Sequence, residues 1–263
     1  WFQLCLKEGL TVFRDQEFSA DQRSRAVERI SDVRGLRLAQ FPEDAGPLAH
    51  PVRPEIYHEI NNFYTATVYE KGAELVRVLR TLIGEDAFRR GMDLYFARFD
   101  GVAATVEDFL SCFAEASGRD LSHFALWYRQ AGTPIVSTTG VYDPAAQTFT
   151  LTLRQETRPT PGQDDKKPVV IPVALALFGD RDEKIPLVSA DATAEELQRG
   201  VFELTTLSRS IIFTQVPSRP APSLLRGFSA PVRLEPAPDS ADLERLLVCD
   251  DDPFNRWQAP SYW

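Results

Sequence analysis

The chain has 263 residues, enough for one large or two smaller domains, and its 43% hydrophobic and 25% charged residues are typical of globular proteins. Its net charge of -9 argues against nucleic acid as a partner, because phosphate binding needs a basic surface. No apolar run approaches the ~20 residues that cross a bilayer, so we expect no membrane partner, and three widely spaced cysteines favour a reduced, cytoplasmic protein.

Neither end of the chain has the pattern of a natural terminus. The sequence begins within an apolar helical pattern, its only methionine is Met92, and it ends just after the opening of a helical segment. We therefore expect the chain to be an excerpt from a longer protein.

The first half of the chain has a helical period. The expected helices span residues 1–18, 21–38, 70–82, 85–99, 106–116 and 120–131. A proline-containing loop is expected from Phe41 through Pro54. Thr105 and Asp108 have the spacing of a capping box, and Gly118, Gly132 and Pro134 act as helix stops.

After Pro134 the period changes from 3.6 to 2. Strict alternation marks residues 148–153 and 173–177, shorter extended runs cover 210–216 and 232–234, and the polar stretch 158–167 is expected to be a long turn. This spacing predicts a small antiparallel sandwich over residues 133–235. A linker then precedes a helix over residues 240–248, for which we expect Ser240 to be the N-cap.

The first expected helix carries two carboxylates on one face. Glu8 and Asp15 are seven residues apart and share their stripe with Trp1, Cys5 and Val12, whereas Lys7 lies about 100° away on the solvent face. A carboxylate on a buried stripe needs a cation, a metal or hydrogen-bond donors. The alternative to a metal ligand is a structural ion pair with a neighbouring helix.

The run WFQLCLKEGLTVFRDQEF, residues 1–18, is similar almost throughout to the helix of the zinc aminopeptidase N family that supplies the third zinc ligand. The resemblance implies that Glu8 binds Zn²⁺, one ion per full-length chain, while an upstream HExxH helix provides two histidines and the general base. Asp15 would orient a ligand histidine, or else form a plain helix ion pair.

A second run, NNFYTATVYEKGAE at residues 61–74, resembles the family segment that stabilises the tetrahedral intermediate. Tyr69 matches the tyrosine that donates to the oxyanion, although taken alone it could be a packed amphipathic tyrosine. Tyr64 resembles a residue that lines the pocket for the first side chain of the substrate, and it could equally be core. Asn61 resembles a residue near the substrate.

Weaker similarity continues to Trp257, so the resemblance covers essentially the whole chain and is densest in residues 1–136. It implies a mixed α and β fold: the helical part of a thermolysin-like catalytic domain, then the antiparallel β-sandwich, then the start of an α-helical domain. The implied domains are residues 1–132, 133–235 and 236–263.

The implied function is zinc-dependent release of N-terminal amino acids from peptides with a free N-terminus. Both the HExxH motif and the amine-binding loop of the family are missing from this sequence. His58 and Glu59 begin like HExxH, but Asn62 stands at the second histidine position, so we interpret His50, His58 and His123 as loop or packing residues. The alternative function is a non-catalytic binding or scaffold module with a degenerate zinc site.

Overall fold

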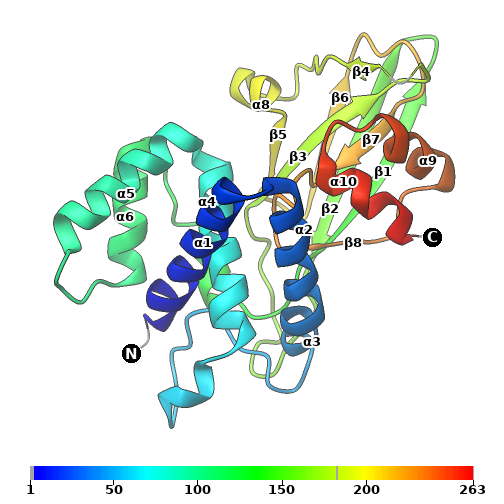
Figure 1. Cartoon of the computed structure of the whole chain (residues 1–263). Coiled ribbons are helices and arrows are strands. Elements are labelled where there is room, and N and C mark those ends of the chain that lie inside the picture. Colours follow the sequence, from blue (N-terminus) through cyan, green and yellow to red (C-terminus); the bar gives the residue numbers. More distant parts are fainter. Residues whose placement is uncertain (1–2, 182, 263) are drawn as a thin grey trace. The chain divides into compact units, whose positions relative to one another are not determined.

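The structure is a computed structural model that describes residues 3–181 and 183–262. The chain divides into two compact units (Figure 1). The first combines the helical segment up to Thr133 with Arg158–Val170, and the second combines Pro134–Thr157 with the chain from Ile171 onward. The mixed fold of helices and small, mainly antiparallel sheets agrees with the predicted fold class. Trp1 and Phe2, which belong to the first predicted helix, lie outside the described residues.

The first unit opens with α1 (Leu4–Gln22) and α2 (Arg25–Gly35). The chain then stays helical where a loop was predicted, through the π-helical turn η1 (Leu36–Gln40) and the short helix α3 (Phe41–Asp44). The loop prediction was wrong for residues 41–44 because Pro42 occupies the first turn of α3. There the missing N–H of proline would have had no intrahelical partner in any case.

The remaining helices of this unit follow the predictions closely, except that a short helix over residues 60–63 was not predicted and the helix predicted for 120–131 is much shorter. They are η2 (Ile60–Phe63), η3 (Thr67–Lys71), α4 (Gly72–Ile83), α5 (Glu85–Phe99), α6 (Val106–Ser117) and α7 (Leu126–Arg129). Thr105 and Asp108 form the predicted capping box of α6, and Gly118 ends it in the left-handed conformation. The predicted helix 120–131 shrinks to α7, because Asp120 accepts hydrogen bonds from Ser122 and the following residues form i→i+3 turns.

Arg158–Val170 runs against the helices of the first unit. Gln163 donates to the carbonyl of Arg129 at 2.8 Å and accepts from the amide of Ala131 at 2.9 Å. Trp127, which is fully buried, donates its indole N–H to the carbonyl of Val170 at 2.7 Å. The segment is therefore an irregular connection, as predicted, that is anchored by hydrogen bonds to the end of the helical segment. The division into three domains at 132/133 and 235/236 stays a prediction.

The second unit contains two sheets. In one, the order is β6 (Ser208–Phe213), β2 (Thr148–Glu156), β1 (Ile135–Asp143) and β8 (Arg233–Leu234). In the other, β3 (Ile171–Phe178) pairs with β4 (Lys184–Ile185), β5 (Val201–Leu204) and β7 (Ala221–Leu224). The pairings are antiparallel except for β8, which runs parallel to β1 and so departs from a purely antiparallel sandwich.

The predictions for this unit missed strands β1, β4, β5 and β7 and one helix between the strands. Strand β1 lacks an alternating burial pattern, because its second half is largely exposed, so its sequence carries no period-2 signal. Helix α8 (Ala194–Arg199) lies between β4 and β5 and begins with a capping box formed by Thr193 and Glu196.

The described chain ends with α9 (Ser240–Cys249), α10 (Pro253–Gln258) and η4 (Ala259–Tyr262). The N-cap of α9 is Asp239, which accepts from the amide of Asp242 at 2.8 Å, so the assignment of this role to Ser240 was wrong by one residue. Leu246 on α9 packs into a buried cluster with Ala176 and Phe178 of β3. No helix among the described residues is both long and apolar enough to cross a membrane.

Candidate functional site

The site predicted from the sequence lies in the first unit, where α1 meets η3. The backbones approach each other at Gly9 of α1 and Gly72, the first residue of α4, which directly follows η3: a Cβ added to Gly9 would lie 2.8 Å from the carbonyl carbon of Gly72, and one added to Gly72 would lie 3.2 Å from the Cα of Gly9. A side chain at either position would separate the elements. This close approach brings Glu8 on α1 beside Tyr69 on η3.

Glu8 is largely buried and lies among polar groups. Its carboxylate is 3.1 Å from the Nζ of Lys7, and its side chain is 14% exposed. Tyr69 lies close enough to Glu8 for that carboxylate to act on the pKa of its hydroxyl. Burial raises the pKa of Tyr69, and the Glu8 carboxylate raises it further.

The expectation that Glu8 and Lys7 stay apart was wrong. The long lysine side chain spans the angle between the two helix positions, so the ion pair forms within α1 and not with a neighbouring helix. The pKa of Lys7 is raised, first by its hydrogen bond to Glu8 and then by the charge of Glu8 and by Tyr64.

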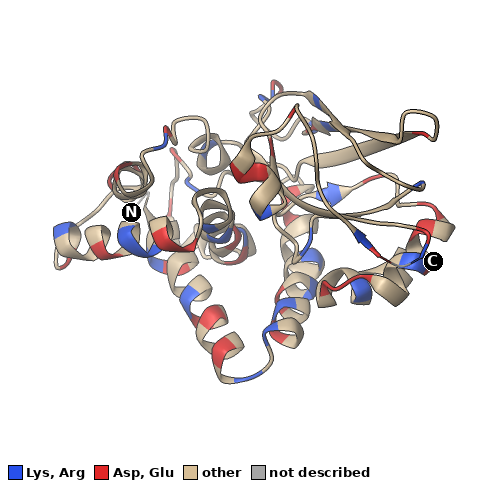
Figure 2. Ribbon diagram, turned by 90° about the horizontal axis from the view of Figure 1, so that it is seen from above, with Lys and Arg blue, Asp and Glu red and all other residues tan. Residues whose placement is uncertain are grey.

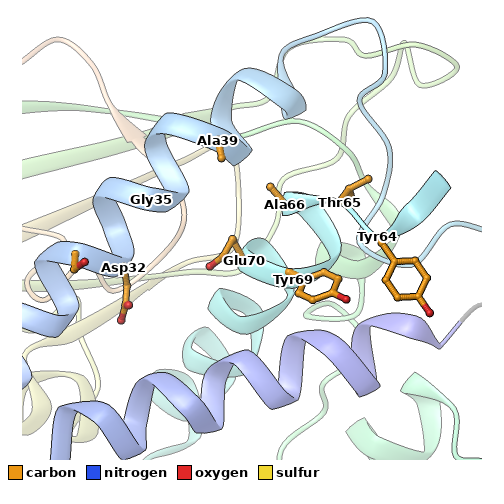
Figure 3. Close-up of a pocket in the computed structure, with 9 residues that line it drawn as sticks. Asp32, Gly35, Ala39, Tyr64, Thr65, Ala66, Tyr69 and Glu70 are labelled. Atoms are coloured by element: carbon orange, nitrogen blue, oxygen red, sulfur yellow. The ribbon is translucent and has the colours of Figure 1, made fainter. Parts of the chain in front are cut away.

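Tyr64 directly follows η2, three residues before the start of η3, and belongs to the same cluster. Its ring centroid is 6.2 Å from that of Tyr69, and the Nζ of Lys7 lies 5.6 Å from the Tyr64 ring centroid. The side chain is 47% exposed, so the alternative that Tyr64 is a core residue was wrong. Figure 3 shows the rings of Tyr64 and Tyr69 side by side next to α1. An exposed aromatic ring at this place can contact a ligand.

A hollow of about 520 Å³ lies beside the two tyrosines (Figure 3). Its other wall comes from α2, which contributes Asp32, and from η1, while Glu70 of η3 lines the hollow on the side of the tyrosines. Burial raises the pKa of Asp32 to about 6, and burial followed by the charge of Glu74 raises the pKa of Glu70. The hollow therefore combines aromatic surface with two carboxyl groups that take up protons more readily than free ones.

Two predicted residues lie outside this cluster. Asp15 is exposed, so the expectation that it shares a buried stripe with Glu8 was wrong. In this part of α1 the buried face carries Phe13, Gln16 and Ala20 instead. Asn61, on η2, is also exposed and donates a hydrogen bond to Glu59 at 3.0 Å. The roles of Asp15 and Asn61 stay predictions.

The histidines support the local structure. His50 places its Nδ1 2.8 Å from the carbonyl of Pro51 and its Nε2 3.0 Å from the hydroxyl of Thr65, which is the residue after Tyr64. His123 hydrogen-bonds the carbonyl of Pro168 at 2.9 Å. These contacts agree with the interpretation of His50 and His123 as packing residues.

The donor set for a metal is incomplete in this chain. Among the described residues, no group of three His, Cys, Asp or Glu side chains could hold a metal ion. Tetrahedral zinc needs three protein ligands and leaves a fourth position for water. Glu8 can supply one oxygen ligand, so the residues present fit a share of a zinc site and not a whole one.

Sequence reasoning missed two contributors to the cluster. Lys7 was assigned to the solvent face, yet it contacts both Glu8 and Tyr64; its position next to Glu8 in the sequence was the available signal. Gly9 and Gly72 were not singled out, although a glycine inside a helical pattern often marks a close backbone approach.

Comparison with known proteins identifies both halves of the chain. Residues 1–128 match the peptidase family M1 domain, and residues 132–237 match a domain of unknown function with an Ig-like fold. The chain is 49% identical over 259 residues to aminopeptidase N of Escherichia coli and 54% identical over 264 residues to aminopeptidase N of Caulobacter vibrioides, in each case over 98% of its own length.

The chain belongs to peptidase family M1. It spans 29% of the length of these M1 relatives. Among solved structures, it is similar to Legionella pneumophila aminopeptidase A in complex with aspartic acid, with a TM-score of 0.81 and 29% identity over 98% of the chain and 27% of that protein.

Proposed function

We propose that the full-length protein is a zinc-dependent aminopeptidase that releases N-terminal amino acids from peptides with a free N-terminus. The observation that carries this proposal is the proximity of Glu8 on α1 to Tyr69 on η3, which is close enough for the Glu8 charge to raise the pKa of the phenol. A metal-binding carboxylate and an oxyanion-stabilising phenol must lie close together, because both act at the same carbonyl group of the substrate. The close approach of Gly9 and Gly72 permits this proximity. The aminopeptidase N relatives support the same activity.

Each residue then has a distinct role. Glu8 would hold Zn²⁺ together with two histidines from outside this chain, and when bound the ion polarises the peptide carbonyl and lowers the pKa of a water molecule. The Tyr69 hydroxyl donates to the carbonyl oxygen as negative charge develops on it. Tyr64 contacts the first side chain of the substrate, Asn61 lies near the substrate, and Asp15 orients a ligand histidine.

We place the full-length protein in the cytoplasm, a proposal that its three free cysteines support. We also propose that this part of the protein is divided into three domains, at residues 1–132, 133–235 and 236–263. The alternative is a non-catalytic scaffold with a degenerate zinc site. Such a protein would show no peptidase turnover, and substitutions at Glu8 and Tyr69 would leave its peptide binding intact.

The proposal is tested by comparing Glu8→Ala and Tyr69→Phe in the full-length protein. Glu8→Ala should lose zinc and peptidase activity together. Tyr69→Phe keeps the ring and removes only the hydroxyl, so zinc content and melting temperature should stay near wild type. Its kcat should fall by about 10²–10³, the usual cost of one oxyanion donor, with a smaller change in KM.

Glu115→Ala is a suitable control, because Glu115 is exposed and pairs with Arg98 at the surface of α5 and α6. It should change neither zinc content nor turnover. A Tyr69→Phe enzyme with full kcat and bound zinc would show that Tyr69 is a packing residue and would remove it from the mechanism.

A further inference from the structure

The short turn that carries Tyr69 is held from outside by another helix. Turn η3 is a π-helical segment of five residues whose N-cap residue, Ala66, makes no capping side-chain bond; locally, the Thr65 hydroxyl accepts one long bond from the Val68 N–H at 3.4 Å. π-Helical turns are rare and are found frequently at functional sites. Something other than local helix propensity must therefore fix the conformation of this turn.

Two consecutive acidic residues of α3 bind the two ends of η3. At the start, Glu43 accepts hydrogen bonds from the backbone N–H of Thr67 at 2.8 Å and from its hydroxyl at 2.5 Å. At the end, Lys71 donates to Asp44 at 2.7 Å. We call these two contacts, Glu43–Thr67 and Asp44–Lys71, the η3 clamp.

The clamp is well shielded from water. Thr67, Lys71 and Asp44 are each at most 1% exposed. Asp44 also accepts from the amide of Gly132 at 2.7 Å, and Lys71 donates to the Gly132 carbonyl at 3.1 Å. Burial would raise the pKa of Asp44, but the charge and hydrogen bond of Lys71 outweigh it and lower the pKa. The pair is thus charged, and its geometry is fixed on several sides.

The clamp and Tyr69 lie on opposite sides of η3. Two steps along a helix turn a side chain by roughly 200°, so Tyr69 points away from the side that carries Thr67 and Lys71. The structure agrees: Thr67 and Lys71 are buried and bound to α3, whereas the Tyr69 ring lies near α1 and lines the hollow (Figure 3). The contacts on one side of η3 therefore set the direction of the phenol on the other side.

We propose that Glu43 and Asp44 are positioning residues that aim the Tyr69 hydroxyl, and this inference rests on the proposed function of Tyr69. Glu43 supplies the missing N-terminal cap of η3, and Asp44 anchors its last residue. Neither residue touches the substrate. A small rotation of η3 moves the phenol at the end of a long side chain, and a misplacement of about 1 Å can lower turnover as much as 10²-fold.

Glu43 is the better residue to test, because it is only half-buried, whereas a change at Asp44 leaves Lys71 buried without its anion. In the full-length enzyme, Glu43→Ala should lower kcat by about 10-fold with KM within about 2-fold and zinc content unchanged. Glu43→Gln keeps an acceptor oxygen for Thr67 and should recover most of that loss.

A double-mutant cycle decides whether Glu43 acts through Tyr69. In a Tyr69→Phe background there is no hydroxyl to aim, so Glu43→Ala should lower kcat by less than about 2-fold further. Glu115→Ala serves as the control for loss of a surface carboxylate. An equal loss in both backgrounds, or no loss in the wild-type background, would overturn the positioning role. If Tyr69→Phe itself leaves kcat unchanged, it is the proposed function of Tyr69 that fails.

Discussion

At the scale of single residues, Glu17 on α1 shows how charge holds the helices that build the site. It pairs with Arg25 at 2.8 Å, with Arg80 at 2.7 Å and with Arg77. Its side chain is 17% exposed, so these ion pairs are only partly screened by solvent. Burial by itself would raise the pKa of Glu17, but Arg80, Arg77 and Arg25 outweigh it and lower the pKa from 4.5 to about 2.

This shift predicts a pH-dependent contribution to stability. The folded pKa lies below the unfolded one, so the contribution is complete above pH 4.5 and is lost as the pH falls toward 2. Its upper limit is roughly 3 kcal/mol. Glu17→Gln should therefore lower the melting temperature at neutral pH, and the difference from wild type should shrink in acid.

Asp21→Asn is the matched control. Asp21 pairs with the same Arg25, but its side chain is 65% exposed. An exposed pair contributes at most about 1 kcal/mol, so this variant should melt close to wild type at every pH. A Glu17→Gln variant whose melting deficit is the same at neutral and acidic pH would contradict the assignment.

The sequence distinguishes some site residues and not others for a physical reason. Glu8 and Tyr69 each stand in a continuous run of residues typical of a known family, so local sequence was enough to select them. Glu43 contacts Thr67 across 24 positions in the chain, and only the packing of α3 against η3 creates that contact. Asp15 was misplaced because a helical period gives a direction on the helix and not the neighbours that cover it.

At the scale of elements, the contact between α1 and η3 depends on the absence of two side chains. Gly9→Ala would place a Cβ 2.8 Å from the backbone of Gly72, and backbone cannot rotate away. We expect this variant to lose about 1–3 kcal/mol of unfolding free energy, the usual cost of overpacking. Turnover should fall as well, because α1 carries Glu8 and η3 carries Tyr69.

Gly35→Ala tests whether any alanine in this region has the same effect. Gly35 has helical backbone angles, and a Cβ built there meets nothing within 4 Å. This variant should gain up to about 1 kcal/mol, since alanine favours a helix more than glycine does. Urea unfolding of both variants in the full-length protein gives the comparison. Equal stability of Gly9→Ala and wild type would mean that α1 and η3 can separate without cost.

The elements themselves were predictable where one face is buried. Helix α5 (Glu85–Phe99) has the predicted bounds, because Gly84 precedes it and its buried residues recur at helical spacing. The π-helical turns η1 and η3 were not predictable from the sequence. Their residues are equally compatible with an ordinary α-helix, and only tertiary contacts widen the turn. Figure 2 shows basic and acidic residues interspersed over the helices of the chain, so charge does not mark the positions of these turns.

At the scale of the whole molecule, the chain changes from helix to strand between α7 and β1, close to the predicted Gly132–Pro134. Sequence periodicity located this change because it depends on local spacing alone. It could not show that Arg158–Val170 returns to the helical unit, since that segment is held by side-chain hydrogen bonds, such as those of Gln163, Lys166 and Trp127, that follow no sequence period.

The last prediction concerns metal binding by this chain alone. Glu8 is the one zinc ligand that we assign to it, and a single carboxylate cannot replace the three protein ligands of a tetrahedral site. After dialysis, the 263-residue chain should retain less than about 0.1 zinc per molecule, whereas the full-length protein should retain about one. Glu8→Ala should therefore change the zinc content of the full-length protein and leave that of the short chain unchanged. One tightly held zinc in the short chain, lost on Glu8→Ala, would mean that further ligands lie within these residues and that the proposed division of the site is wrong.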